Sequence, residues 1–139
     1  MYKHILLPTD GSDLSLHGVR HGLALAKESR CKATVITVSA PFTLRFPGTA
    51  ETWVEAQNRT AEATFAAAQK LAEEVGVEIV SLHRAGESPA EIIVDAAKEL
   101  GCDLIVMASH GRRGVTRMLL GSQTAEVVRL SEVPVLVVR

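Results

Sequence analysis

The sequence has almost no charge imbalance, which excludes two classes of partner. Its 139 residues include 15 Lys and Arg against 16 Asp and Glu, a formal net charge of -1 at pH 7. General nucleic-acid binders and polybasic membrane anchors both need an excess of basic residues facing phosphate groups. We therefore expect neither nucleic acid nor a membrane as a partner.

Long apolar runs and clustered cysteines are also missing. No apolar stretch approaches the roughly 18 residues of a membrane span, and the first residues lack the apolar region and cleavage site of a signal peptide. The two cysteines, Cys31 and Cys102, are far apart and lack the spacing of metal ligands. These absences predict a cytoplasmic protein with two reduced thiols.

The composition is that of an ordinary globular protein. Hydrophobic residues make up 47% of the chain and charged residues 22%, which is enough to build a core without a disulfide or a metal. The length predicts a single domain over residues 1–139.

Short apolar runs alternate with longer segments of helical periodicity. The runs are typical of parallel strands buried on both faces, and they are Lys3–Leu7, Ala33–Val38, Val77–Leu82, Asp103–Ala108 and Pro134–Val138. Four helices are predicted between them: around residues 16–26, around 54–75, from a Ser88–Glu91 capping box to Gly101, and over 122–130. This alternation predicts an α/β fold with helices on both faces of a parallel sheet. In the first helix, Gly18 and Gly22 are expected to allow close packing on the sheet.

Polar segments follow two of the predicted strands, Pro8–Ser12 after the first and Ser109–Gly114 after the fourth. Such strand ends are where these sheets bind ligands. Around the second segment, residues 104–125 contain no Asp or Glu. Glycines there free backbone amides to face a ligand, and the helix beginning near Ser122 favours an anion. A phosphate site is predicted, with a solvated loop and a simple helix cap as the alternative. The glycines and basic residues concerned are His110, Gly111, Arg112, Arg113, Gly114, Arg117 and Gly121.

Other candidate chemistry is weaker. Asp10, directly after the first strand, either accepts hydrogen bonds from ribose hydroxyls or base amines or only stabilises its turn. His17 and His21 have a zinc-binding spacing but no evident third ligand, so no metal site is expected. Walker A, dinucleotide, serine hydrolase and metalloprotease motifs are absent. No base for activating water is identifiable, so any ATP hydrolysis is expected to be slow.

Three segments resemble the universal stress protein family in its single-domain, UspA-like form, and the resemblance covers essentially the whole chain. They are Ile5–Ser12, Asp103–Gly111 and Val133–Val138. The most specific part is the nucleotide motif of the ATP-binding members, which is Gly, two residues, Gly, nine residues, Gly, then Ser or Thr. The corresponding residues here are Ala108, Gly111, Gly121 and Ser122, so alanine stands at the first glycine position.

This resemblance implies a three-layer α/β/α sandwich with a five-stranded parallel sheet of order 3-2-1-4-5, Rossmann-like and similar to adenine nucleotide alpha hydrolases. It implies that ATP, with Mg²⁺ held by the phosphates, binds where the first and fourth strands end. The adenosine would contact Pro8, Thr9, Asp10 and the backbone of Val38. The ribose and inner phosphates would lie near Met107 and Ala108. The outer phosphates would be held by Gly111, Gly121, Ser122, Gln123 and Thr124. The charges of Arg112 and Arg113 are expected to add mainly a salt-dependent attraction.

The sequence leaves three functions open. The first is a stress protein that binds ATP as a regulatory or signalling ligand. The second is a nucleotide-free homodimeric interaction protein whose glycine and arginine loop docks a partner. The third, an adenylyl-transferring enzyme, expects a His-x-Gly-His or Ser-Gly-Gly-x-Asp-Ser signature that the chain lacks. The first two share an expected homodimer, because the apolar fifth strand is an open edge in the implied order.

Overall fold

The computed structural model of the chain describes residues 1–110 and 120–139. Within them, strands and helices alternate, which confirms the predicted α/β class. Their order and bounds are β1 (His4–Pro8), α1 (Asp13–Ser29), β2 (Lys32–Ser39), α2 (Ala50–Val75), β3 (Ile79–Ala85), α3 (Pro89–Leu100), β4 (Leu104–Ala108), α4 (Ser122–Leu130) and β5 (Val135–Val138).

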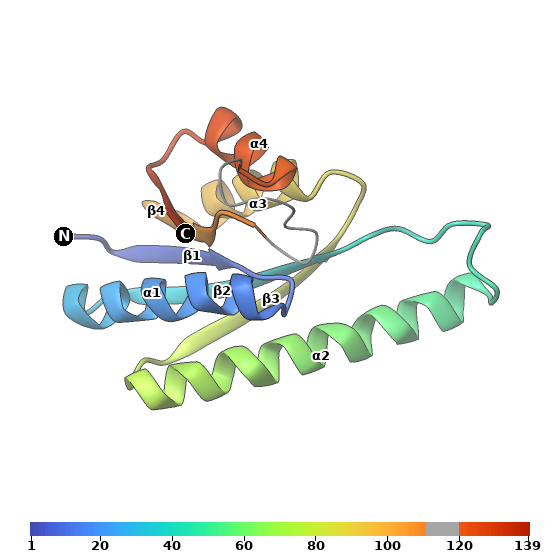
Figure 1. Cartoon of the computed structure of the whole chain (residues 1–139), viewed down its shortest axis with the longest axis horizontal. Helices are drawn as coiled ribbons and strands as arrows, with labels where there is room; N and C mark the ends of the chain where they lie inside the picture. The colour runs from blue at the N-terminus through green and yellow to red at the C-terminus, as the bar shows by residue number, and fades with distance from the viewer. Residues whose placement is uncertain (111–119) are drawn as a thin grey trace.

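The described strands form one five-stranded parallel sheet in the order β3-β2-β1-β4-β5. Helices α1 and α2 cover one face and α3 and α4 cover the other, giving three layers (Figure 1). The expected order 3-2-1-4-5 is therefore confirmed. The order reverses between β1 and β4, and a crevice at such a reversal is where ligands bind in doubly wound sheets.

Alternation along β1 divides the hydrophobic core in two. Ile5 and Leu7 belong to the cluster under α1 and α2, whereas Leu6 belongs to the cluster under α3 and α4. All three side chains are fully buried, and each such burial stabilises the fold by about 1.5–3 kcal/mol. The central strands are thus held from both faces, so the positions of their carboxyl ends are well defined.

Helix α1 lies close to the sheet where two of its residues have no side chain. A Cβ atom built at Gly18 would lie 2.7 Å from the backbone nitrogen of Ala108, and one at Gly22 would collide with the side chain of Leu7. The predicted close packing is confirmed. The first half of α1 therefore rests directly on the ends of β4 and β1.

Strand β3 begins two residues later and ends three residues later than predicted. The sequence predicted Val77–Leu82, but the Val77 N–H donates to the Ala72 carbonyl as part of the turn that closes α2. Val77 therefore belongs to the end of the helix, and the strand begins at Ile79. Among the described strands, β3 pairs only with β2 and is therefore an edge strand. Val80 is 65% exposed, so the predicted burial of this strand on both faces is wrong.

The start of α3 also differs in its capping. Ser88 occupies the N-cap position and Pro89 begins the helix, as predicted, but the Ser88 side chain makes no capping hydrogen bond. The predicted capping box is therefore wrong. The amide of Ala90 is instead satisfied by a side chain from another helix, since it donates to Oε1 of Gln123 at 3.1 Å.

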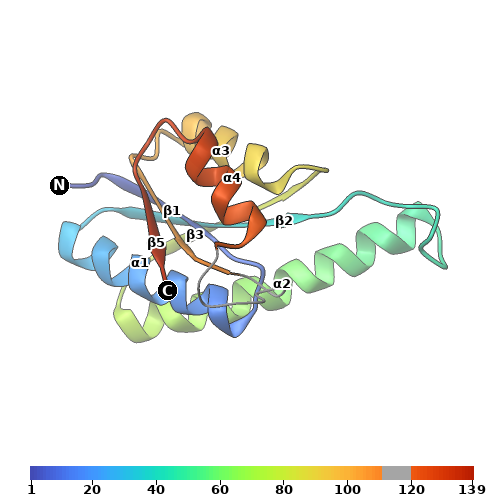
Figure 2. The same ribbon diagram turned by 45° about the horizontal axis from the view of Figure 1, so that its top comes forward.

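The beginning of α2 and the loop before it form an arm, residues 40–60, that projects beyond the sheet (Figures 1 and 2). No residue of the arm is buried. A capping box of Thr49 and Thr52 starts the helix four residues before the first apolar position predicted for it. Three aromatic rings hold the arm together: Phe46 lies 6.3 Å from Phe42 and 5.0 Å from Trp53, centroid to centroid.

The two cysteines lie at the amino end of the sheet, opposite the edge formed by the carboxyl ends of the strands. Cys31 directly precedes β2, and Cys102 lies two residues before β4. Both are free thiols, as predicted. Burial, with a smaller contribution from the nearby charge of Asp103, raises the pKa of Cys102 to about 11, so this thiol is unreactive at neutral pH. Within the described ranges, no helix is long and apolar enough to span a bilayer.

Candidate functional site

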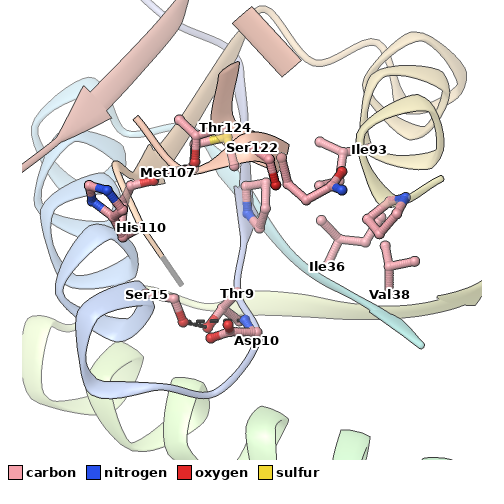
Figure 3. A pocket seen from close by; sticks show the side chains of 15 residues that line it. Thr9, Asp10, Ser15, Ile36, Val38, Ile93, Met107, His110, Ser122 and Thr124 are labelled. Carbon is pink, nitrogen blue, oxygen red and sulfur yellow. Dashed lines mark hydrogen bonds between the residues drawn. The ribbon is translucent and has the colours of Figure 1, made fainter. Parts of the chain in front are cut away.

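A cavity of about 370 Å³ opens at the carboxyl ends of β1, β2 and β4, between the first turns of α1, α3 and α4 (Figure 3). This volume lies in the range of small-ligand sites. Several residues predicted for the nucleotide contacts line it together: Pro8, Thr9, Asp10, Val38, Met107, Ala108, Gly121, Ser122, Gln123 and Thr124. Residues far apart in the sequence thus meet at the predicted end of the sheet.

One end of the cavity is an apolar slot. Its walls are Ile36 and Val38 from β2 and Pro89 and Ile93 from α3. These side chains offer no charged or hydrogen-bonding groups, so the slot suits the face of a flat, weakly polar ring. Ile36 and Ile93 are almost fully buried against the core, which gives the slot firm walls.

The backbone of Val38 faces the cavity beyond the end of β1. The Ile36 carbonyl still accepts from Thr9, at 2.9 Å, and Pro8 is the last residue of β1 paired with β2. Because backbone groups of alternate residues point the same way, those of Val38 point toward this side as well. They offer one donor and one acceptor side by side in the slot, where the sheet provides no further strand.

The turn after β1 is ordered by a network of hydroxyl groups. The Oγ1 atom of Thr9 and the Oγ of Ser15 lie 2.6 Å apart, and both residues are buried. Ser15 Oγ also accepts from the Asp10 N–H at 3.2 Å, and Thr9 Oγ1 accepts from the Gly11 N–H at 3.1 Å. Asp10 accepts in turn from the Ser12 N–H at 2.9 Å. The network fixes the Asp10 carboxylate beside the cavity (Figure 3).

Three contacts hold the first turn of α4 against its neighbours. The Gly121 N–H donates to the Ser109 carbonyl at 2.7 Å, and the buried Thr124 hydroxyl donates to the Ala108 carbonyl at 2.9 Å. Gln123 accepts from Ala90, as described above. Ser122 is exposed at the first helical position. The helix end carries partial positive charge and points into the cavity, so an anion is favoured there.

Ala108, which replaces the first motif glycine, fits its position without strain. Arg30 is the one non-glycine residue with a positive φ in the described chain, so the backbone at Ala108 does not need glycine. By alternation along β4, its methyl group lies on the same face as Leu104 and Val106, toward α1. The backbone of Ala108 remains at the edge of the cavity.

Two of the predicted phosphate contacts, Gly111 and Arg112, lie outside the described residues, as do Arg113, Gly114 and Arg117. Four lining residues were missed by the sequence reasoning: Ser15, Ile36, Pro89 and Ile93. His110, which the sequence assigned to the basic phosphate segment, also lines the cavity. The helical apolar spacing marked Ile93 as core, and only the position of α3 over the strand ends reveals that it also lines the cavity. Ser15 carried no signal that separates it from an ordinary polar residue in the first turn of a helix.

The described residues offer little for binding a metal directly. Asp10 is the one carboxylate among the described residues that line the cavity. In the part of the chain that the structure covers, no group of three His, Cys, Asp or Glu side chains is placed to hold an ion. His17 and His21 are exposed on α1. A Mg²⁺ ion at this site would therefore have to be held chiefly by ligand phosphates, as is usual for nucleotide sites.

Comparisons with known proteins agree on one family. The model of the Universal stress protein family matches residues 1–139. Universal stress protein MJ0531 of Methanocaldococcus jannaschii is 38% identical over all of this chain and 83% of its own length. The solved structure of MJ0577 from the same organism is 31% identical, with a TM-score of 0.80 over 99% of this chain and 96% of that one. A universal stress protein solved in complex with cAMP is 28% identical, with a TM-score of 0.79 over 99% and 97% of the chains.

Proposed function

Because the chain belongs to the universal stress protein family, we propose that it binds ATP, with Mg²⁺ held by the phosphates, as a regulatory or signalling ligand. One observation carries the proposal. An apolar slot, a positioned carboxylate and the N-terminus of α4 meet in a single cavity of about 370 Å³. The apolar slot suits the base, the carboxylate suits the ribose hydroxyls, and the helix N-terminus suits the phosphates. The cAMP complex of a family member supports an adenine nucleotide as the ligand class.

The adenine would lie between β2 and α3. The Val38 N–H would donate to ring N1, and the Val38 carbonyl would accept from the exocyclic amine. Both groups are already aimed at the slot because β1 has ended. Ile36 and Ile93 would then cover the faces of the ring.

The ribose would lie over the turn after β1. Asp10 is ordered by its neighbours before any ligand arrives, so little conformational entropy is lost when its carboxylate accepts from the ribose hydroxyls. A hydrogen bond to a charged acceptor contributes more than a neutral one.

The phosphates would reach the first turn of α4. The exposed Ser122 hydroxyl and the free amides of that turn would donate to phosphate oxygens. A Cβ atom at Gly121 would lie 3.1 Å from the Ser109 carbonyl oxygen, so a larger residue there would displace the turn that holds the phosphates.

Regulation is favoured over rapid turnover. Asp10, the one carboxylate in the described lining, is assigned to the ribose end of the cavity rather than to the terminal phosphate. His110 is the one titratable base in the same set. Its ring Nδ1 lies 3.2 Å from the Ser109 hydroxyl, and no other described lining residue is a candidate base for activating water, so hydrolysis is expected to be slow.

A homodimer through β5 completes the proposal. In the described sheet β5 is an edge strand, and Leu136 in its middle is 37% exposed. Antiparallel pairing of two β5 strands about a twofold axis would give hydrogen-bond partners to the unpaired backbone groups of both edge strands.

Isothermal titration of nucleotide-free protein with ATP and Mg²⁺ tests the nucleotide proposal. We expect one site per chain, with weaker binding of GTP. Freshly purified protein should also release adenine nucleotides into acid. If millimolar ATP gives no heat and no nucleotide is released, the proposal is wrong, and the nucleotide-free interaction protein is the better account.

A further inference from the structure

We infer that Gln123 is a positioning residue that joins α3 to α4 and so sets the width of the nucleotide site, rather than a phosphate ligand. The inference rests on the proposed function and reassigns one of its residues. The observation behind it is the hydrogen bond from the Ala90 N–H to Oε1 of Gln123.

This bond satisfies a backbone N–H of α3 that has no hydrogen-bond acceptor within its own helix. Ala90 is the second residue of α3, where amides lack partners within the helix. The Ser88 side chain, which would ordinarily serve, makes no capping bond. Ala90 is only 1% exposed, whereas the Gln123 side chain that covers its amide is exposed. The bond therefore shields this amide from water, and its loss removes a hydrogen bond from a largely buried donor.

The two helices joined in this way form different parts of one site. Pro89 and Ile93, one on each side of the joined amide in α3, form the outer wall of the base slot. Ser122, next to Gln123 in α4, lies at the phosphate end. The Gln123 bond therefore ties the wall of the base slot to the turn that would hold the phosphates.

The bond also leaves the N-terminus of α3 with fewer free donors for an anion. With its amide oxygen on Ala90, Gln123 occupies a donor of the α3 N-terminus that a phosphate could otherwise use. The first turn of α4 is held by Gly121 and Thr124 to the end of β4, and Ser122 is left exposed at the cavity. The first turn of α4 is therefore the helix end expected to receive the phosphates.

The test uses adenosine beside ATP, because adenosine has no phosphate for Gln123 to contact. Replacing Gln123→Ala should weaken adenosine and ATP by the same factor, about five-fold for one hydrogen bond. Gln123→Glu keeps an oxygen for the Ala90 amide, so adenosine should bind within two-fold of wild type. ATP should then bind more weakly, because the new carboxylate repels phosphates. Gln69→Ala, an exposed glutamine on α2, is the matched control and should change neither affinity.

Amide hydrogen exchange of ligand-free protein supplies a readout that does not depend on nucleotide. The Ala90 amide should exchange about five-fold faster in Gln123→Ala and at the wild-type rate in Gln123→Glu. A loss of ATP affinity with unchanged adenosine affinity would make Gln123 a phosphate ligand and overturn the inference. Wild-type binding with no change in Gln123→Ala would overturn the inference alone. A wild type that binds neither ligand would overturn the proposed function as well.

Discussion

The hydroxyl groups of Thr9 and Ser15 lie 2.6 Å apart in the buried floor of the site, and each also accepts a backbone N–H from the turn between them. Ser15 belongs to α1, whereas Thr9 follows β1. The pair therefore connects the helix to the strand end at the residue that presents Asp10. A small shift here would move the carboxylate away from a bound ribose.

Ser15→Ala should therefore weaken nucleotide binding by loosening the turn that carries Asp10. Loss of the shared hydroxyl leaves the Thr9 side chain and the Asp10 amide with one partner fewer, which should cost about 1–2 kcal/mol of unfolding free energy. Urea unfolding measures that loss, and calorimetry should show weaker binding of both ATP and adenosine. Ser29→Ala, near the far end of α1, is the control; an equal effect there would contradict the role of Ser15.

Ser122→Ala should affect only ligands that carry phosphates. The lost hydroxyl would have donated to a charged oxygen, so ATP affinity should fall by about 1–2 kcal/mol, roughly 5- to 30-fold. Adenosine affinity should stay the same, because the slot lies at the other end of the cavity. Parallel titrations check both, and a matching loss for adenosine would place Ser122 away from the phosphates.

Ala108→Gly should restore the family motif without improving binding. The alanine needs no special backbone conformation, and its methyl group lies toward α1 rather than α3. We expect ATP affinity within two-fold of wild type and a loss of about 0.5–1 kcal/mol in unfolding free energy from the added chain flexibility. A ten-fold gain in affinity would show that the methyl group crowds the ligand.

Leu136→Lys should separate the proposed dimer. Leu136 lies in the middle of β5 and is partly exposed, so lysine there would place two like charges close together across a twofold axis. Light scattering at micromolar concentration should give the dimer mass for wild type and the monomer mass for the variant. Val128→Lys, on the exposed face of α4, is the control. A wild type that scatters as a monomer would contradict the dimer.

Asp103 should make stability depend on pH in the acid range. Burial raises its pKa, but backbone hydrogen bonds from His4 and Lys3 outweigh this effect and leave the pKa below its ordinary value. A lowered folded-state pKa stabilises the fold above the unfolded pKa of about 3.9, and this contribution is lost as pH falls through the folded value. Asp103→Asn should thus be less stable than wild type at pH 7, with the gap closing below about pH 4.

Urea unfolding at several pH values measures this gap. Asp95→Asn, on the exposed face of α3, should show no comparable dependence. A constant difference between wild type and Asp103→Asn from pH 7 to pH 3 would show that the charge of Asp103 is not involved.

The fold and the location of the site were predictable because strong local signals set them. The apolar run before Pro8 and the glycine and serine at the start of α4 fix two strand–helix junctions, and the family order brings them together. The capping of α3 was not predictable, because the partner of Ala90 is Gln123, 33 residues away. The cavity walls formed by Ile36 and Ile93 were not predictable either. An apolar residue at strand or helical spacing looks the same in the sequence whether it faces the core or a cavity.

The projecting arm has a consequence for how the molecule moves through water. Helix α2 has 26 residues and so is about 39 Å long, comparable with the whole diameter expected of a compact chain of this size. A body with such an extension experiences more friction than a sphere of equal mass. The monomer should therefore elute early from a gel-filtration column and sediment slowly. An elution volume alone would suggest a larger assembly than is present, whereas scattered intensity reports mass independently of shape.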